Sequence, residues 1–205
     1  MSDLHGISVV GGNFPSTKIN DVDLSMSRLS KARFYNAEMR YVLFDSSDMS
    51  NGVLFNSICT NCSFEDVIFT NSVFSGSNFE NCSFAGAYLI GVDFSYVSLH
   101  DCNFANAVFG DDNGTVKNLT PAQLATCQRV KGAKGLSEEF LKKVFEINPD
   151  LQNSDTPYKN PVRWKNDIEC PVDSAYISKV VSGMVTIDDV LLSESAESDE
   201  KKNES

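Results

Sequence analysis

Large apolar residues recur at every fifth position along the first half of the chain. Twenty consecutive positions follow this period, and eleven of them are phenylalanine. A period of five matches neither an α-helical face, which repeats about every 3.6 residues, nor a plain strand, which repeats about every two. The pattern instead predicts short strand–turn units. The positions are Phe14, Ile19, Leu24, Leu29, Phe34, Met39, Phe44, Met49, Leu54, Cys59, Phe64, Phe69, Phe74, Phe79, Phe84, Leu89, Phe94, Leu99, Phe104 and Phe109.

A second set of positions repeats with the same period. The residue two before each large one is always small or β-branched, from Gly12 to Ala107. Strand alternation points both residues of such a pair to the same side. The residue two after each large one is Asp, Asn or Gly in fourteen of twenty cases, which favours a turn. Each unit is therefore predicted to have two inward side chains, outward residues between and after them, and a corner.

The repeat resembles that of the pentapeptide-repeat family, whose loose motif is a small residue, a polar residue, Leu or Phe, and two variable residues. The segments 81–86 (Asn-Cys-Ser-Phe-Ala-Gly) and 101–106 (Asp-Cys-Asn-Phe-Ala-Asn) are clear copies. The resemblance implies a right-handed quadrilateral parallel β-helix in which four repeats make one square coil. Twenty repeats then imply about five coils, and strand spacing gives a length of roughly 24 Å.

Residues twenty apart are expected to stack in columns. Phe44, Phe64, Phe84 and Phe104 should form one column of the core, below Leu24. A second column should contain Cys62, Cys82 and Cys102, continuing Val22 and Val42. Such columns predict a packed core and no pore.

Changes in composition divide the chain. We expect an N-terminal cap or partial repeats at 1–11, the β-helix at 12–111, a helical C-terminal cap at 112–148, an extended loop with a further helix at 149–192, and a disordered acidic tail at 193–205. Thr120, Pro121 and Gln123 form a helix start, with a helix expected over 121–127. A second helix is expected over 138–147. Both helices should cover the end of the solenoid, and self-association as a homodimer through an apolar helix face is the alternative use.

The candidate chemistry is sparse. Cys59 and Cys62 form a CxxC motif, but the repeat phase explains each as an inward residue, so buried structural thiols are expected. Cys127 and Cys170 lie outside the repeats and are expected to react sooner with a thiol reagent. His5 and His100 have no nucleophile and orienting carboxylate suggested near them. We therefore expect no catalytic residue, no metal site and no cofactor, and the protein is predicted not to be an enzyme.

The overall charge bears on compartment and partners. A formal net charge of −11 and a pI near 4.5 argue against direct nucleic-acid binding and against an anionic membrane surface. The N-terminus shows no basic region followed by a long apolar stretch, and no apolar run reaches the roughly 18 residues of a membrane span. A cytoplasmic protein with reduced cysteines is the resulting expectation.

The charge is unevenly distributed along the repeats. Between Tyr41 and Asp112 there is no Lys or Arg but there are nine acids, whereas the first coil and a half is basic. Some proteins of the family that this repeat resembles are DNA mimics that bind type II topoisomerases such as DNA gyrase and confer quinolone resistance. That resemblance nominates Asp45, Glu65, Asp66 and Glu80 as mimic acids. Nine acids on four faces are fewer than the roughly fourteen phosphates that 24 Å of duplex would present.

The function favoured by the sequence is a protein–protein interaction scaffold. Its flat polar faces would bind another protein, whose identity the sequence does not give. Large outward side chains are the candidate contacts, because a buried interface would give them a purpose. They are Tyr35, Arg40, Tyr41, Phe55 and Tyr88. DNA mimicry of a topoisomerase substrate is the alternative.

Overall fold

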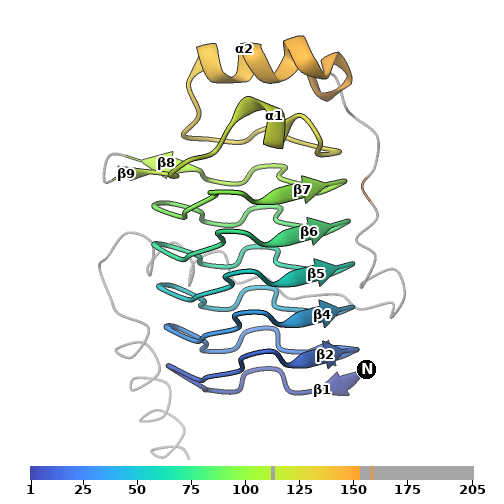
Figure 1. Cartoon of the computed structure of the whole chain (residues 1–205), viewed down its shortest axis with the longest axis vertical. Helices are drawn as coiled ribbons and strands as arrows, with labels where there is room; N and C mark the ends of the chain where they lie inside the picture. The colour runs from blue at the N-terminus through green and yellow to red at the C-terminus, as the bar shows by residue number, and fades with distance from the viewer. Residues whose placement is uncertain (112–113, 153–157, 159–205) are drawn as a thin grey trace, which may run out of the picture. The chain divides into compact units, whose positions relative to one another are not determined.

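A computed structural model describes residues 1–111, 114–152 and 158, all within one compact unit, Met1–Cys170. It is a parallel β-solenoid of about five turns, as the repeat predicts (Figure 1). Strands β2 (Lys18–Asn20), β4 (Glu38–Arg40), β5 (Ile58–Thr60), β6 (Asn78–Glu80) and β7 (Ser98–His100) pair in a five-stranded parallel sheet with an offset of twenty residues. We call this side of the solenoid the strand face.

Three further faces complete each coil, and each is held by single bridges between residues twenty apart. The valine face has the bridged column Arg33, Val53, Val73 and Asp93. The serine face has Leu43, Ser63, Ser83 and Asn103, and the Tyr88 face has Arg28, Asp48, Ile68, Tyr88 and Val108. Along the chain the order is Tyr88 face, valine face, strand face, serine face. The valine and strand faces therefore meet at one edge.

The corners have a left-handed backbone. Every fifth residue from Gly6 to Asn106 has φ between 51° and 74°. At most corners the amide three residues after the large apolar residue donates to its carbonyl, for example Ser47 N to Phe44 O at 3.0 Å. A left-handed residue at the third position of such a turn defines type II geometry. The prediction of a turn two residues after each large residue is confirmed at these positions.

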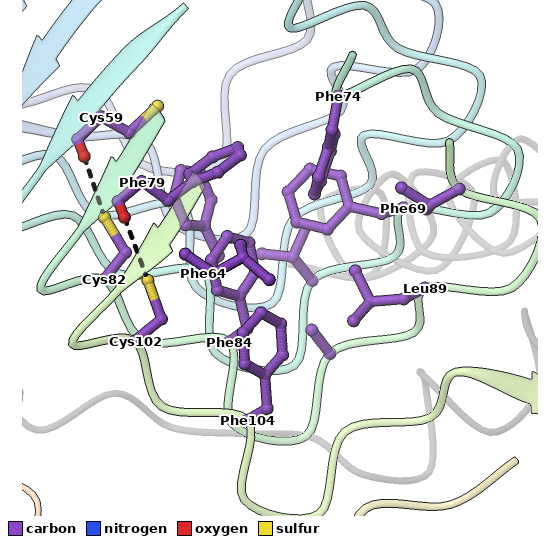
Figure 2. Packing of buried hydrophobic residues seen from close by; sticks show 14 of the residues in the cluster. Cys59, Phe64, Phe69, Phe74, Phe79, Cys82, Phe84, Leu89, Cys102 and Phe104 are labelled. Carbon is purple, nitrogen blue, oxygen red and sulfur yellow. Dashed lines mark hydrogen bonds between the residues drawn. The ribbon is translucent and has the colours of Figure 1, made fainter. Parts of the chain in front are cut away.

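Phenylalanine fills the interior in continuous stacks. The rings of Phe44, Phe64, Phe84 and Phe104 stack almost parallel, with centroids 4.9 to 5.1 Å apart. Figure 2 shows Phe64, Phe84 and Phe104 of this stack. Each of these side chains is fully buried. Offset stacking at this separation is a favourable aromatic geometry, and it follows from the coil spacing because the stacked residues are twenty apart.

The small inward residues donate hydrogen bonds to backbone carbonyls, and their small volume leaves room for the phenylalanine rings. Ser47 and Ser72 donate from Oγ to carbonyls 23 residues earlier, those of Leu24 and Met49, each at 2.8 Å. Thiols at equivalent positions do the same, with Cys82 donating to the Cys59 carbonyl at 3.3 Å (Figure 2). A buried hydroxyl or thiol without a partner would be destabilising. The repeat therefore places a small donor where a coil below offers an acceptor.

The N-terminal residues extend the solenoid by part of a coil. Strand β1 (Ser2–Asp3) pairs with β3 (Val22–Asp23), and Ser8 bridges Arg28. Of the two forms expected for residues 1–11, the structure has partial repeats. Phe14 and Ile19 are only half-buried, because no complete coil lies below them.

Backbone pairing continues beyond Asp111, where the sequence period ends. A hairpin of β8 (Gly110–Asp111) and β9 (Gly114–Thr115) is followed by bridges of Asp93 with Lys117, Asn103 with Arg129 and Val108 with Lys134. The offset is now 24 and then 26 residues, so inserted residues hide this last coil from a search at period five.

Two helices cover this end of the solenoid (Figure 1). Helix α1 (Pro121–Leu124) has the expected Thr120–Gln123 capping box and Pro121 at its start, but it ends three residues before the expected boundary. Helix α2 (Glu138–Ile147) has the expected bounds and a Ser137 N-cap, and its Val144 is buried. The side-chain amide of Asn148 donates to the Ala125 carbonyl at 2.9 Å, which ties the end of α2 to the end of α1.

Only the start of the next segment is described. The 3-10 turn η1 (Pro149–Gln152) occupies the beginning of the segment 149–192 that was expected to be an extended loop with a helix. The rest of that segment, the expected disordered tail at 193–205 and Cys170 lie outside the described residues, apart from Tyr158.

Candidate partner-binding surface

Outward residues form columns on each face, just as inward residues do. Their burial differs sharply from face to face. Leu43, Asp45 and Ser63 on the serine face are at most 1% exposed, and Asp48, Ile68 and Ile90 on the Tyr88 face are also buried. On the valine and strand faces several large apolar residues remain accessible. Phe55 is 44% exposed and Ile58 is 43% exposed.

The valine face has an apolar centre between charged ends. Val53 and Val73 are half-buried and bridge each other, with Arg33 one coil before and Asp93 one coil after. Phe55 lies in the neighbouring outward column, where its carbonyl accepts from Asn36 N at 2.9 Å. The backbone of this face is fully engaged near the valines, since Val53 N donates to Ala32 O and Val73 N to Gly52 O. Only side chains are therefore available there for a partner.

Asp93 is fixed as an anion at one end of this column. Burial alone would raise the pKa of its carboxyl, but hydrogen bonds from Ser95, Asn118 and Ser75 hold that pKa well below its usual range. Ser95 and Asn118 donate to Oδ1 at 2.7 and 2.8 Å, and Ser75 donates to Oδ2 at 2.7 Å. Donors of this kind stabilise the charged form, so a negative charge persists there at neutral pH.

Tyr96 occupies the edge between the valine and strand faces. Its side chain is 94% exposed and its backbone is left-handed, with φ of 57°. The left-handed region costs an ordinary L-residue roughly 1–2 kcal/mol. A shallow hollow beside it is lined by Ser95, Asn118, Leu119, Thr120 and Gln123. A bulky aromatic side chain in this position has no packing role in the core.

The five residues expected to bind a partner do not form one patch. Tyr35 and Phe55 lie together on the valine face, although the Tyr35 hydroxyl is used in a 2.8 Å bond to Asn13. Arg40 is exposed on the strand face, and Tyr41 lies at its far corner. Tyr88 lies on another face and is half-buried, and this burial, with Asp66 nearby, raises the pKa of its phenol.

Sequence reasoning missed four residues that the structure brings to this surface, namely Val53, Ile58, Val73 and Tyr96. Three of them occupy the outward position just before a large inward residue, and Tyr96 occupies a corner. Reading the outward columns at a spacing of twenty would have placed Val53 next to Val73. Nothing in the sequence would have separated these from Ile68, which is buried.

The acids nominated for DNA mimicry need one correction. Asp45 is fully buried, where it accepts from Ser63 Oγ at 2.5 Å and Glu65 N at 2.9 Å, so it cannot present a surface charge. Glu65 is half-buried and accepts from Ser83 Oγ at 2.8 Å. Asp66 is half-buried at a corner, and Glu80 is exposed on the strand face. Asp45 and Glu65 lie in one column, but Asp66 and Glu80 lie outside it.

The five cysteines within the described residues are all buried. Cys59, Cys62, Cys82, Cys102 and Cys127 are free and buried. Burial in an apolar interior raises the pKa of each thiol, which opposes formation of the reactive thiolate. The expectation that Cys127 lies outside the solenoid is wrong, because its thiol donates to Leu99 O at 3.4 Å and so extends the column of Cys62, Cys82 and Cys102.

Sites for other chemistry are sparse within the described ranges. His5 bonds its neighbour Asp3 at 2.7 Å, and His100 lies 3.4 Å from Asp101, both at the surface. In residues 1–111, 114–152 and 158, no three His, Cys, Asp or Glu side chains gather as metal ligands would. Among the same residues, no helix has the length and apolar character needed to cross a bilayer.

Comparison with known proteins places the repeats in a family. Residues 59–131 match the family described as pentapeptide repeat region. Comparison with curated protein sequences gives no match. The family match extends past Asp111 into the coil with irregular spacing, in agreement with the bridges of Lys117 and Arg129.

Several solved structures are similar at low sequence identity. A trypsin-treated variant of QnrB1, a plasmid-mediated fluoroquinolone resistance protein, is 21% identical with a TM-score of 0.49, covering 66% of this chain and 68% of that one. HetL, a pentapeptide-repeat protein involved in heterocyst differentiation regulation in the cyanobacterium Nostoc sp. strain PCC 7120, is 16% identical with a TM-score of 0.30, covering 63% of each chain. A pentapeptide-repeat protein of the Arabidopsis thaliana thylakoid lumen is 14% identical with a TM-score of 0.32, covering 79% of this chain and 90% of that one. The family match shows that residues 59–131 are a pentapeptide repeat region, and left-handed corners at every fifth residue from Gly6 to Asn106 show the same five-residue repeat before it.

Proposed function

We propose that this protein is a non-enzymatic scaffold that binds another protein through the valine and strand faces. One observation supports this most strongly. Phe55, Ile58 and Tyr96 remain exposed on these two adjoining faces and their shared edge, whereas Leu43, Ile68 and Ile90 on the other faces are buried. Elsewhere on the solenoid Val10 and Met26 are exposed, but they lie in different coils and do not continue this group. Exposed apolar groups that gather in one region are typical of interaction sites.

The packed interior supports a role without catalysis. Phenylalanine side chains fill the described coils and their rings contact one another, and this packing leaves little room for a substrate between them. Cysteines and histidines in the described ranges are accounted for by packing or by surface bonds to a neighbouring acid. A cytoplasmic location, where thiols stay reduced, suits the free cysteines.

DNA mimicry of a topoisomerase substrate is the less favoured function. A mimic should present acids in rows that follow the phosphates of a duplex. Asp45 is buried, and Glu65, Asp66 and Glu80 lie on different faces or corners. Binding of DNA gyrase is therefore kept as one of the outcomes that the binding experiment below distinguishes.

The test starts from immobilised full-length protein. Retained proteins would be identified at low and high salt, and binding would then be reconstituted with the purified partner. We expect retention in high salt and loss on Phe55→Ser, with Tyr88→Ser on the Tyr88 face as the matched control. A partner that dissociates steeply with salt, inhibition of gyrase supercoiling, and loss on Glu80→Gln would instead support the mimic. Turnover of a substrate by the pure protein would exclude both functions.

Dimerisation through the C-terminal helices is a separate prediction. Phe140, Val144 and Phe145 of α2 pack on the solenoid end, while Ile147 is 58% exposed. Sedimentation velocity on the full chain and on Ile147→Ser tests it. A monomer at all concentrations would exclude this homodimer without affecting the scaffold proposal.

A further inference from the structure

The exposed and half-buried apolar residues of the valine face and its edge run along the direction in which the coils stack. Val53 and Val73 occupy successive coils, Phe55 lies beside Val53, and Ile58 follows Phe55 around the edge. Tyr96 lies on the same edge in a later coil. We call these five residues the edge stripe. It spans about three coils, or roughly 14 Å at strand spacing.

The backbone under the edge stripe excludes one common mode of recognition. Val53 and Val73 donate to the coil below, and their carbonyls accept from Phe34 N and Leu54 N. Ile58 is paired on both sides within the strand face, with Glu38 and Asn78. A partner therefore cannot add a strand to these faces and must contact side chains alone.

The spacing of the edge stripe fits a helix. A helix has its own backbone hydrogen bonds satisfied and advances about 5.4 Å per turn, close to the roughly 4.8 Å between coils. Laid along the stacking direction, it can present one side chain per turn to each coil. About ten residues of helix would cover the stripe.

The charged residues near the edge stripe indicate whether a partner segment should be cationic or anionic. Residues 50–109 carry no Lys or Arg, and Asp93 is the one of their five acids that lies in the column of Val53 and Val73. Asp93 at the end of the valine column is held as an anion by three neighbouring side chains, and its Oδ2 accepts only from Ser75 among the described residues. Lys117 follows Asp93 in the column and Arg33 precedes Val53, so among the described residues the cations of this column lie beyond the two ends of the stripe.

Resting on the proposed function, we propose that the edge stripe docks a cationic amphipathic helix of another protein. Its apolar residues lie on Val53, Phe55, Val73 and Ile58. A lysine or arginine lies near Asp93 and the ring of Tyr96, because arginine binds both carboxylates and aromatic faces.

The probe is a displayed library of 15-residue helices with one apolar face and randomised polar positions, selected against the full-length protein. We expect enriched helices to carry more Lys and Arg than the starting library. Their affinity should fall at least tenfold on Phe55→Ser and on Tyr96→Asn. Met26→Asn is the matched control, since Met26 is also a left-handed corner residue, is 49% exposed, and lies between the serine and Tyr88 faces.

Three results would overturn the proposal. They are no enrichment, enrichment of acidic helices, and enriched helices that bind Phe55→Ser and Tyr96→Asn as well as wild type. Sedimentation velocity of the pure protein could give a fourth such result. A homodimer that Phe55→Ser abolishes would show that a second copy of this chain, and not a helix of another protein, binds the edge stripe. A reconstituted natural partner that binds normally to Phe55→Ser would overturn this inference while leaving the scaffold function standing.

Discussion

Each corner residue must adopt a left-handed backbone, and the chain meets this demand in two ways. Most corners have Asn, Asp or Gly, which tolerate the conformation, as at Asn61 and Gly86. Met26, Tyr41 and Tyr96 adopt it as well, with φ of 53° to 57°. Local propensity would not have predicted those three. The period predicts them, because each coil forces its corner at a fixed position.

Some corners also interlock between coils. A Cβ on Gly76, Gly86 or Gly91 would lie 2.1 to 2.3 Å from the Oδ1 atom of the residue twenty before, which is Asn56, Asp66 or Asn71. Gly11 is different, since a Cβ there would meet nothing within 4 Å. Both kinds of glycine have positive φ. Comparing a substitution at Gly86 with one at Gly11 therefore separates the free-energy cost of a left-handed backbone from that of the contact between coils.

Gly86→Ala should destabilise the protein more than Gly11→Ala. Both substitutions place alanine in the left-handed region, at about 1 kcal/mol, and overpacking against Asp66 should add roughly 1–3 kcal/mol at Gly86. The free energy of unfolding in urea measures both. Asp66→Ala in the Gly86→Ala background should recover part of the loss. Equal costs at the two sites would show that the contact with Asp66 does not matter.

Tyr96→Asn should raise stability while removing a partner contact. Asparagine tolerates the left-handed backbone better than tyrosine, and little packing is lost because the side chain is 94% exposed. We expect a gain of about 0.5–1 kcal/mol, read as a higher thermal midpoint. Phe55→Asn, at a position outside the left-handed set, should show no gain. A lower midpoint for Tyr96→Asn would mean that the tyrosine stabilises the folded chain itself.

At the scale of elements, the strands and helix starts could be predicted, but the final coil could not. The capping residues Thr120, Pro121 and Gln123 mark their helix without reference to its surroundings, so the sequence is sufficient. The pairing of Asn103 with Arg129 spans 26 residues because the hairpin and α1 are inserted. Only three-dimensional stacking reveals such an offset, and it also explains why Cys127 was expected outside the solenoid.

Gln123 joins α1 to the coil below, so its removal should loosen the cap. Its Nε2 donates to Phe94 O and Val97 O, both at 2.9 Å, and its Oε1 accepts from Thr120 N. Gln123→Ala should cost about 1–3 kcal/mol, because the Val97 carbonyl loses its side-chain donor and the Phe94 carbonyl keeps only the Val97 amide. Hydrogen exchange should speed up in the coil containing Val97. The exposed Gln128→Ala is the control, and equal effects of the two substitutions would contradict the anchoring role.

At the scale of the whole solenoid, the interior could be predicted and the surface could not. Inward positions follow from the period alone, since every coil places them identically. The burial of an outward residue does not follow from the period. Asp45 and Phe55 both occupy the outward position after a large residue, yet Asp45 is buried and Phe55 is 44% exposed. For the same reason, the five residues that the sequence suggested as partner contacts lie on different faces of the solenoid.

The buried thiols should report on opening of the solenoid. Cys62, Cys82, Cys102 and Cys127 are buried, and burial raises the pKa of each thiol. Iodoacetamide at pH 8 should leave them unmodified in the native protein and modify all of them in urea, as read by peptide mass spectrometry. Cys170 is predicted to react first. Native modification of Cys127 at a rate independent of denaturant would show that the cap opens locally.

The contribution of a core phenylalanine to the free energy of unfolding should depend on its position along the stack of coils. Phe84 has ring contacts with Phe64, Phe69, Phe74, Phe79 and Phe104. Among the described residues Phe14 has a ring contact with Phe34 alone, and it is half-buried. In a solenoid each coil is stabilised mainly by its neighbours. Phe84→Ala should therefore cost about 3–5 kcal/mol, and Phe14→Ala clearly less, in urea denaturation followed by circular dichroism. Phe84→Leu, which retains apolar volume, should fall between wild type and Phe84→Ala. Equal costs for Phe14→Ala and Phe84→Ala would mean that the half-covered first coil is as tightly coupled as the centre, contrary to its exposure.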